Sequence, residues 1–193
     1  SAITFEDKIY LIVGRNSSDT YTKKVLIYED SASGWREKSN LSGPARGNVT
    51  SLIFQNRIWV IGGSSANGYT NTVESYDLDS DSWSLEVPLP IGRNAPVSFE
   101  YKGKLFVGGG KFASSGQLTD SLISLNLDSS LWEQAGTLPE VKYSGDSTTL
   151  DGYHYILGGS TELGVSNKVF AADITPPMDL YYREANASGT ITL

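Results

Sequence analysis

Cysteine is absent from this chain of 193 residues, and histidine and methionine occur once each. Without cysteine there is no disulfide, no thiolate metal site and no cysteine nucleophile. The single histidine, His154, lies in the apolar run YHYILGG. We expect a packed strand residue there, with a catalytic or metal-binding role as the alternative, because most metal sites need several such ligands. The sequence therefore predicts neither a metal site nor a cofactor.

Basic clusters and long apolar runs are also missing. The 15 Lys and Arg residues stand against 22 Asp and Glu residues, which gives a formal net charge of −7. Phosphate neutralisation supplies most of the affinity for nucleic acid, so an acidic chain of this kind is a poor candidate for that partner. No stretch approaches the ~18 apolar residues of a membrane-spanning helix. Glu6, Asp7 and Lys8 interrupt the start too early for a signal peptide.

An apolar run that ends in glycine occurs four times, as YLIVGR, WVIGG, FVGGG and YILGG. The third copy has three glycines, so two registers are open for it. Taking Gly14, Gly62, Gly109 and Gly158 as equivalent, the steps are 48, 47 and 49 residues. In this alignment Arg15 replaces the second glycine of the first copy. A fixed period near 50 is the signature of a repeat architecture.

Two further signals recur in the same register. An aromatic residue follows each run, as Trp35, Trp83 and Trp132, with Tyr181 or Tyr182 in the fourth copy. A short turn precedes each run, as FEDK, FQNR, YKGK and LDGY. The third residue of each turn is Asp, Asn or Gly, which tolerate the positive φ of tight hairpins. Each copy therefore predicts a hairpin, a glycine doublet, a third strand, a turn and an aromatic fourth strand.

Four short antiparallel strands form one twisted sheet, which cannot bury both of its faces alone. Face-to-face packing of successive sheets around an axis solves this problem. The stretch VESYDLDSDSW followed by PLPIGRNAPVSFEYKGKLFVGGG resembles the kelch repeat, and the resemblance covers residues 1 to about 185. It implies an all-β kelch-like β-propeller of four four-stranded antiparallel blades. The predicted blades are residues 1–40, 41–88, 89–137 and 138–185.

Four blades are fewer than the five to eight that the kelch resemblance implies. Three explanations stay open: a four-bladed ring, further blades outside these residues, or a second chain that completes the structure. An open set of four blades would expose two apolar sheet faces, which is costly in water.

The last eight residues, 186–193, are surplus to the four blades. Their β-prone end consists of Gly189, Thr190, Ile191, Thr192 and Leu193. We expect this tail either to pack on its own propeller or to add as a strand to a sheet edge, in its own first blade or in another copy. Head-to-tail addition between copies would build a fibre.

Three cations precede the inner strands at equivalent positions. Arg46, Arg93 and Lys142 are separated by steps of 47 and 49 residues. In a propeller such positions lie near one mouth of the central channel, where three cations suit an acidic sugar or a carboxylate. The alternative is that they are turn residues that bond to loop carbonyls.

The sequence offers little enzyme chemistry. The resemblance admits galactose-oxidase-like proteins, whose copper site needs histidines and a cysteine cross-link that this chain lacks. It also admits enzymes of the sialic-acid mutarotase type, which use polar channel residues without a metal. The acid pairs Glu6/Asp7 and Glu29/Asp30 lie in predicted turns, where we expect them to be solvated.

Four N-x-[ST] sequons are candidates for glycosylation: Asn16, Asn40, Asn48 and Asn186. The composition, rich in Ser, Thr and Asn and acidic overall, resembles prokaryotic surface and extracellular repeat proteins. We therefore expect a non-enzymatic extracellular or cell-surface module that binds proteins or glycans. Self-assembly into a homo-oligomer or filament through the C-terminal strand is a further hypothesis. The alternatives are a mutarotase-type enzyme and an intracellular kelch adaptor, which would carry a partner domain such as BTB.

Overall fold

The computed structural model describes residues 1–30, 34–173 and 182–185. The chain divides into two compact units, Ser1–Asn94 and Ala95–Leu193. Throughout these described ranges every regular element is a β-strand, and each unit contains two four-stranded antiparallel sheets. Tyr181, Asn186 and the predicted assembly strand 189–193 lie outside the described residues.

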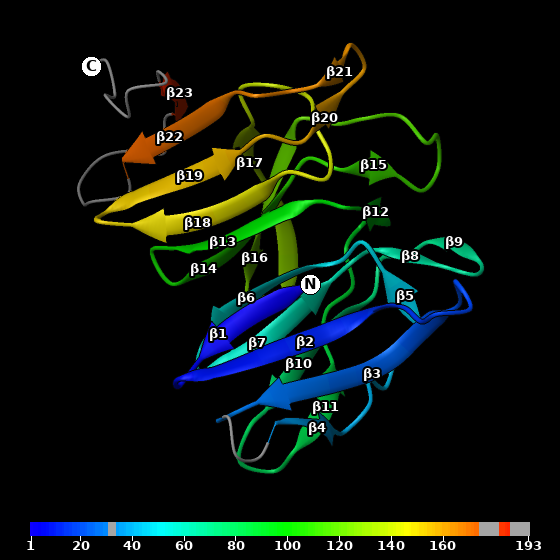
Figure 1. The fold of residues 1–193 in the computed structure, drawn as a ribbon. Helices are drawn as coiled ribbons and strands as arrows, with labels where there is room; N and C mark the ends of the chain where they lie inside the picture. The colour runs from blue at the N-terminus through cyan, green and yellow to red at the C-terminus, as the bar shows by residue number, and fades with distance from the viewer. Residues whose placement is uncertain (31–33, 174–181, 186–193) are drawn as a thin grey trace. The chain divides into compact units, whose positions relative to one another are not determined.

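The first unit holds the sheets of the first two repeats (Figure 1). The first sheet runs in the order β1 (Ala2–Phe5), β2 (Lys8–Arg15), β3 (Tyr21–Tyr28) and β4 (Trp35–Lys38). The second runs in the order β6 (Thr50–Phe54), β7 (Arg57–Ile61), β10 (Val73–Asp77) and β11 (Ser82–Leu85). Short strands β5 (Arg46–Gly47), β8 (Ser64–Ser65) and β9 (Gly68–Tyr69) form a small third sheet, and β12 spans Arg93–Asn94.

The second unit repeats this plan. Its first large sheet contains β13 (Val97–Tyr101), β14 (Lys104–Gly108), β16 (Ser121–Asn126) and β17 (Leu131–Thr137). Its other large sheet contains β18 (Asp146–Leu150), β19 (Tyr153–Leu157), β22 (Val169–Asp173) and β23 (Tyr182–Ala185). The short strands are β15 (Lys111–Phe112), β20 (Ser160–Thr161) and β21 (Gly164–Val165). Each large sheet lies inside one of the four predicted blade ranges.

The hairpin that opens each repeat closes with a two-residue turn. Both turn residues have positive φ, between 48° and 80°, in the pairs Glu6–Asp7, Gln55–Asn56, Lys102–Gly103 and Asp151–Gly152. Two central residues with positive φ define the type I′ turn, whose twist matches that of the flanking strands. The local sequence therefore fixes the register of the first two strands in every repeat.

The glycine doublets also share one backbone conformation. Their φ values are 63° and 105° at Gly62 and Gly63, 66° and 89° at Gly109 and Gly110, and 55° and 92° at Gly158 and Gly159. In the first repeat Val13 and Gly14 take these conformations, with φ of 51° and 123°. The doublet there is Val13–Gly14 and not Gly14–Arg15 as aligned above, because a β-bulge between Ile12 and Gly14 shifts the register by one residue.

The core of the first unit lies between its two large sheets. The first sheet contributes Tyr10, Ile12, Val25 and Ile27, and the second contributes Ile58, Val60, Tyr76 and Trp83. A corresponding cluster in the second unit includes Val97, Phe99, Tyr101 and Phe106 from one sheet and Ile156 and Phe170 from the other. Burial of each such side chain contributes roughly 1.5–3 kcal/mol. Face-to-face packing within each unit is thus the main source of its stability.

In the second repeat the aromatic residue of the fourth strand fills the space between the sheets as predicted, whereas Trp35 of the first repeat is 51% exposed. Trp83 packs on Tyr76 with ring centroids 4.9 Å apart, and its Nε1 donates a hydrogen bond to the Ser39 carbonyl oxygen at 2.9 Å. Asp81 accepts hydrogen bonds from the Ser39 amide (3.1 Å) and the Tyr76 hydroxyl (2.6 Å). In the fourth repeat Tyr182 takes the position of this tryptophan, since it pairs with Ala172 as Trp83 pairs with Tyr76.

Candidate functional site

Arg46 lies on β5 with its side chain completely buried. Its Nη1 lies 2.5 Å from Oε2 of Glu74, also fully buried, and its Nε donates to the Gly62 carbonyl oxygen at 3.1 Å. The other carboxylate oxygen of Glu74 accepts the Gly43 amide at 2.7 Å. Burial lowers the pKa of Arg46, while the Glu74 charge acts in the opposite direction. The pair therefore links β5, which precedes the second sheet, to the glycine doublet that follows β7.

Lys142 is the equivalent cation in the second unit and is 2% exposed. Its Nζ donates to the Gly158 carbonyl oxygen at 3.0 Å and lies 4.6 Å from the centroid of the Phe170 ring. Glu140 contributes a carboxylate oxygen at 3.5 Å. Burial lowers the pKa of Lys142, and Glu140 counteracts this. Arg93 is 3% exposed, and burial lowers its pKa to about 10.

For these three cations the sequence left open a ligand site at a channel mouth or a structural role in turns, and the structure shows internal partners for Arg46 and Lys142. Arg46 and Lys142 each bond to the carbonyl of the first doublet glycine, as the alternative interpretation expected. All three side chains are buried. Their arrangement suits bracing of the repeats, and ligand binding by them stays a prediction.

His154 is a packed strand residue with 1% exposure. Its ring stacks on Phe99 with centroids 4.0 Å apart, and its Nδ1 lies 3.3 Å from the Thr149 hydroxyl oxygen. Burial lowers the pKa of His154 to about 4, so the ring is neutral at pH 7. A neutral, stacked imidazole behaves here as a core aromatic side chain.

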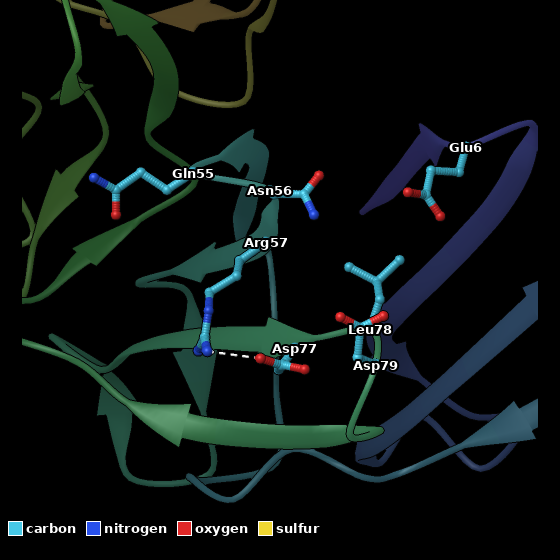
Figure 2. A pocket seen from close by; sticks show the side chains of 7 residues that line it. All are labelled: Glu6, Gln55, Asn56, Arg57, Asp77, Leu78 and Asp79. Carbon is cyan, nitrogen blue, oxygen red and sulfur yellow. Dashed lines mark hydrogen bonds and ion pairs between the residues drawn. The ribbon is translucent and has the colours of Figure 1, made fainter.

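A pocket of about 130 Å³ lies at the turn ends of the first unit. Three turns of neighbouring sheets form it: the β1–β2 turn, the β6–β7 turn and the β10–β11 turn. Figure 2 shows its seven lining side chains, which are Glu6, Gln55, Asn56, Arg57, Asp77, Leu78 and Asp79. The type I′ turns position Glu6, Gln55 and Asn56, and the hydrogen bonds from Ser80 to Asp77 brace the β10–β11 turn.

The pocket carries more negative than positive charge. Arg57 Nη2 lies 2.7 Å from Oδ2 of Asp77, so these two charges offset each other. The Ser80 amide and hydroxyl both donate to Asp77, at 3.0 and 2.9 Å, and lower the pKa of that carboxyl. Glu6 and Asp79 are exposed, and neither forms an ion pair with another residue in the described parts of the chain. Two carboxylates thus remain available to a basic group from outside.

Sequence reasoning treated Glu6 as a solvated turn residue and did not assemble this pocket. A signal was present, because antiparallel order places the first and last turns of every repeat at the same end of its sheet. The turns of adjacent repeats then converge on one surface. What the sequence lacked was the spacing between neighbouring sheets.

Three of the predicted glycosylation sites can be placed, and Asn16, Asn40 and Asn48 are all exposed. The Asn16 side-chain oxygen accepts the amides of Ser18 and Thr20, both at 3.0 Å. Glycosylation at these sites stays a prediction. Where the structure describes the chain, it holds neither a helix long and apolar enough to cross a membrane nor a cluster of acidic, His or Cys side chains able to hold a metal ion.

Comparison with known proteins defines the family. Residues 1–159 match the model of the "KLHDC2/KLHL20/DRC7 Kelch-repeats domain". Kelch-like protein 41b of Danio rerio is 26% identical over 155 residues, which is 77% of this chain and 25% of that protein. Beta-scruin of Limulus polyphemus is 26% identical over 170 residues, 85% of this chain and 18% of that protein.

The chain belongs to the kelch-repeat family, and its four sheets are kelch β-propeller blades. A solved structure, titled "Structure of YjhT", has a TM-score of 0.79 with 18% identity and covers 96% of this chain and 63% of its own. At that identity the likeness concerns the fold alone. The chain spans a quarter or less of the length of the two curated relatives named above. Both of these come from animals, so they lend no support to the prokaryotic surface subtype.

Proposed function

We propose that this chain is a non-catalytic kelch module that binds proteins, and that the pocket at the turn ends of the first unit receives a basic side chain of the partner. The observation that carries this proposal is the pair of available carboxylates, Glu6 and Asp79, on two of the turns that line the pocket. Exposed loops on a rigid scaffold are the usual place for binding residues. A lysine or arginine of the partner would pair with the two carboxylates and contact Leu78 through its methylene stem.

The test is binding to an array of peptides that differ only in Lys or Arg against Gln at one central position. We expect wild-type protein to prefer the basic peptides, and Glu6→Gln with Asp79→Asn to remove that preference. Glu133→Gln is the matched control, because Glu133 is an exposed carboxylate on β17 of the second unit. Equal binding to basic and neutral peptides would contradict the proposal. So would a loss of equal size in the control.

Salt provides an independent check on the same site. Exposed charges more than a Debye length apart are screened, and that length falls from about 10 Å at 0.1 M to about 3 Å at 1 M salt. We therefore expect the preference for basic peptides to weaken as salt rises. A preference that is unchanged at 1 M salt would point to apolar contacts instead.

Four finer features of this function are also proposals. We place the module outside the cell or at its surface, with glycans as alternative ligands and glycosylation at the exposed sequons. Mass spectrometry of protein from its natural source, before and after deglycosylation, tests the sequons. We further propose strand addition by residues 189–193, and deletion of residues 186–193 tests it. Unchanged assembly and melting temperature after that deletion would overturn strand addition.

A further inference from the structure

One face of the first sheet carries large apolar side chains that are partly exposed. Ile9 pairs with Tyr28 and Tyr28 with Trp35, so these residues share that face, and Leu11 and its partner Leu26 lie beside them. Ile9, Leu11 and Trp35 are 41%, 42% and 51% exposed. We call these five residues the first-sheet outer face. The opposite face of the same sheet packs in the core of the first unit.

The second sheet shows what covers such a face. Ile58 pairs with Tyr76 and Tyr76 with Trp83, which is the register of the outer face one repeat earlier. Ile58 and Tyr76 are 0% exposed and Trp83 is 9% exposed, because the first sheet packs on them. The same positions are therefore buried in one repeat and exposed in the other. The difference is the presence of a kelch sheet on that side.

The side chains that do the covering define the chemistry of the occupant. In the first sheet they are Ile3, Phe5, Tyr10, Ile12, Val25 and Ile27. They offer two aromatic rings and four branched aliphatic groups to the sheet that follows. An occupant of the first-sheet outer face should present a similar set in the same register.

The fourth sheet carries one aromatic and three aliphatic side chains at four of these six positions, with Thr148 and Ala171 at the positions of Ile3 and Ile27. At the positions of Phe5, Tyr10, Ile12 and Val25 it carries Leu150, Tyr155, Leu157 and Val169. Leu150 and Leu157 are 60% and 37% exposed. We call these four residues the fourth-sheet outer face. The opposite face of that sheet, with Ile156 and Phe170, packs in the core of the second unit.

We propose that the first-sheet outer face binds the fourth-sheet outer face of a second copy of this chain. Every copy carries both members of the complementary pair, which is why a second copy is the occupant that the structure favours. The contact joins two different surfaces, so it repeats head to tail and gives closed rings or open chains of molecules. This inference is independent of the pocket and of the protein-binding function proposed above.

The test is sedimentation velocity with light scattering over a range of protein concentrations. We expect wild-type protein to form dimers or larger species. Leu11→Glu and Leu157→Lys each place a charge in one outer face and should weaken association by about 30-fold or more, as loss of an interface hot spot does. Leu163→Lys is the matched control, because Leu163 is 101% exposed in the turn between β20 and β21 and belongs to neither face. It should associate like wild-type protein.

Mixing separates this contact from other modes of association. Leu11→Glu retains an intact fourth-sheet outer face, and Leu157→Lys retains an intact first-sheet outer face. Their mixture should form dimers and nothing larger, because each pair restores a single interface. Ile9→Lys repeats the test if Leu11→Glu has lost its β-sheet circular dichroism.

Several outcomes would overturn the proposal. One is a wild-type monomer at every concentration. Another is a set of outer-face variants that associate like wild-type protein. Association that is lost on deletion of residues 186–193 but kept in Leu11→Glu would assign assembly to the C-terminal tail. None of these results bears on the peptide array, so the two proposals fail separately.

Discussion

At the scale of single residues, Arg46 and Glu74 form an ion pair in which both side chains are fully buried. Removal of one partner leaves an uncompensated buried charge, which costs about 3–5 kcal/mol. We expect Arg46→Met and Glu74→Leu each to lower the free energy of unfolding by that amount. The double variant should lose much less free energy of unfolding than the two single variants together, because apolar residues of similar size replace the pair. Urea denaturation of the four proteins measures the coupling, and additive losses would contradict this account.

His154 makes a second residue-scale prediction. Burial lowers its pKa to about 4 in the folded chain, against an ordinary value of 6.5. The unfolded chain therefore binds the proton first, and the contribution of the neutral ring to stability is complete above about pH 6.5. It declines as the pH falls from there toward 4, by up to about 1.4 kcal/mol per pH unit. His154→Phe keeps the stacking on Phe99 and should remove this component. The same pH dependence in both proteins would contradict the prediction.

At the scale of elements, the glycine doublet has a steric reason that one substitution can isolate. Gly62 has a φ of +63°, and a Cβ there would lie 2.5 Å from the Arg93 carbonyl oxygen. Gly103 has a nearly equal φ of +70°, with nothing within 4 Å of its Cβ position. Gly103→Ala should cost about 1–2 kcal/mol for the left-handed backbone alone. Gly62→Ala should cost clearly more, because the backbone must also move. Thermal unfolding compares them, and equal losses would argue against close approach at the doublet.

The turns and glycine doublets show which elements could be predicted from the sequence. Hairpin turns and doublets follow from local chemistry, because Asn, Asp and Gly accept the positive φ that these positions need. The sequence alignment did not identify Val13 as part of the doublet, because valine rarely adopts a φ of 51°. Only the bulge in β2 reveals its position. The partner of Arg46 could not be read from the sequence either. The positions equivalent to Glu74 are occupied by Leu26, Ile123 and Phe170, so no charge repeats there.

At the scale of the whole molecule, the period of the sequence predicted four sheets, but what covers their outer faces depends on surfaces that no single repeat contains. Leu11 and Val60 occupy equivalent positions in the same local sequence pattern, but Leu11 is exposed and Val60 is buried. The difference arises from the neighbour of each sheet. For this reason the assembly of this kelch chain has to be measured, and the variants of the two outer faces are the means to do so.

A core substitution should destabilise mainly the unit that contains it, because sheets in a repeat architecture gain most of their stabilisation from immediate neighbours. Ile58 and Ile156 are both 0% exposed, one in the core cluster of each unit. Ile58→Ala and Ile156→Ala should each cost about 2–5 kcal/mol. Hydrogen exchange followed by mass spectrometry should show lost amide protection chiefly in the strands of the first unit for the first variant and in those of the second unit for the second. Equal loss across both units in both variants would mean that the described chain unfolds as one cooperative body, and the two clusters would then not be separate sources of stability.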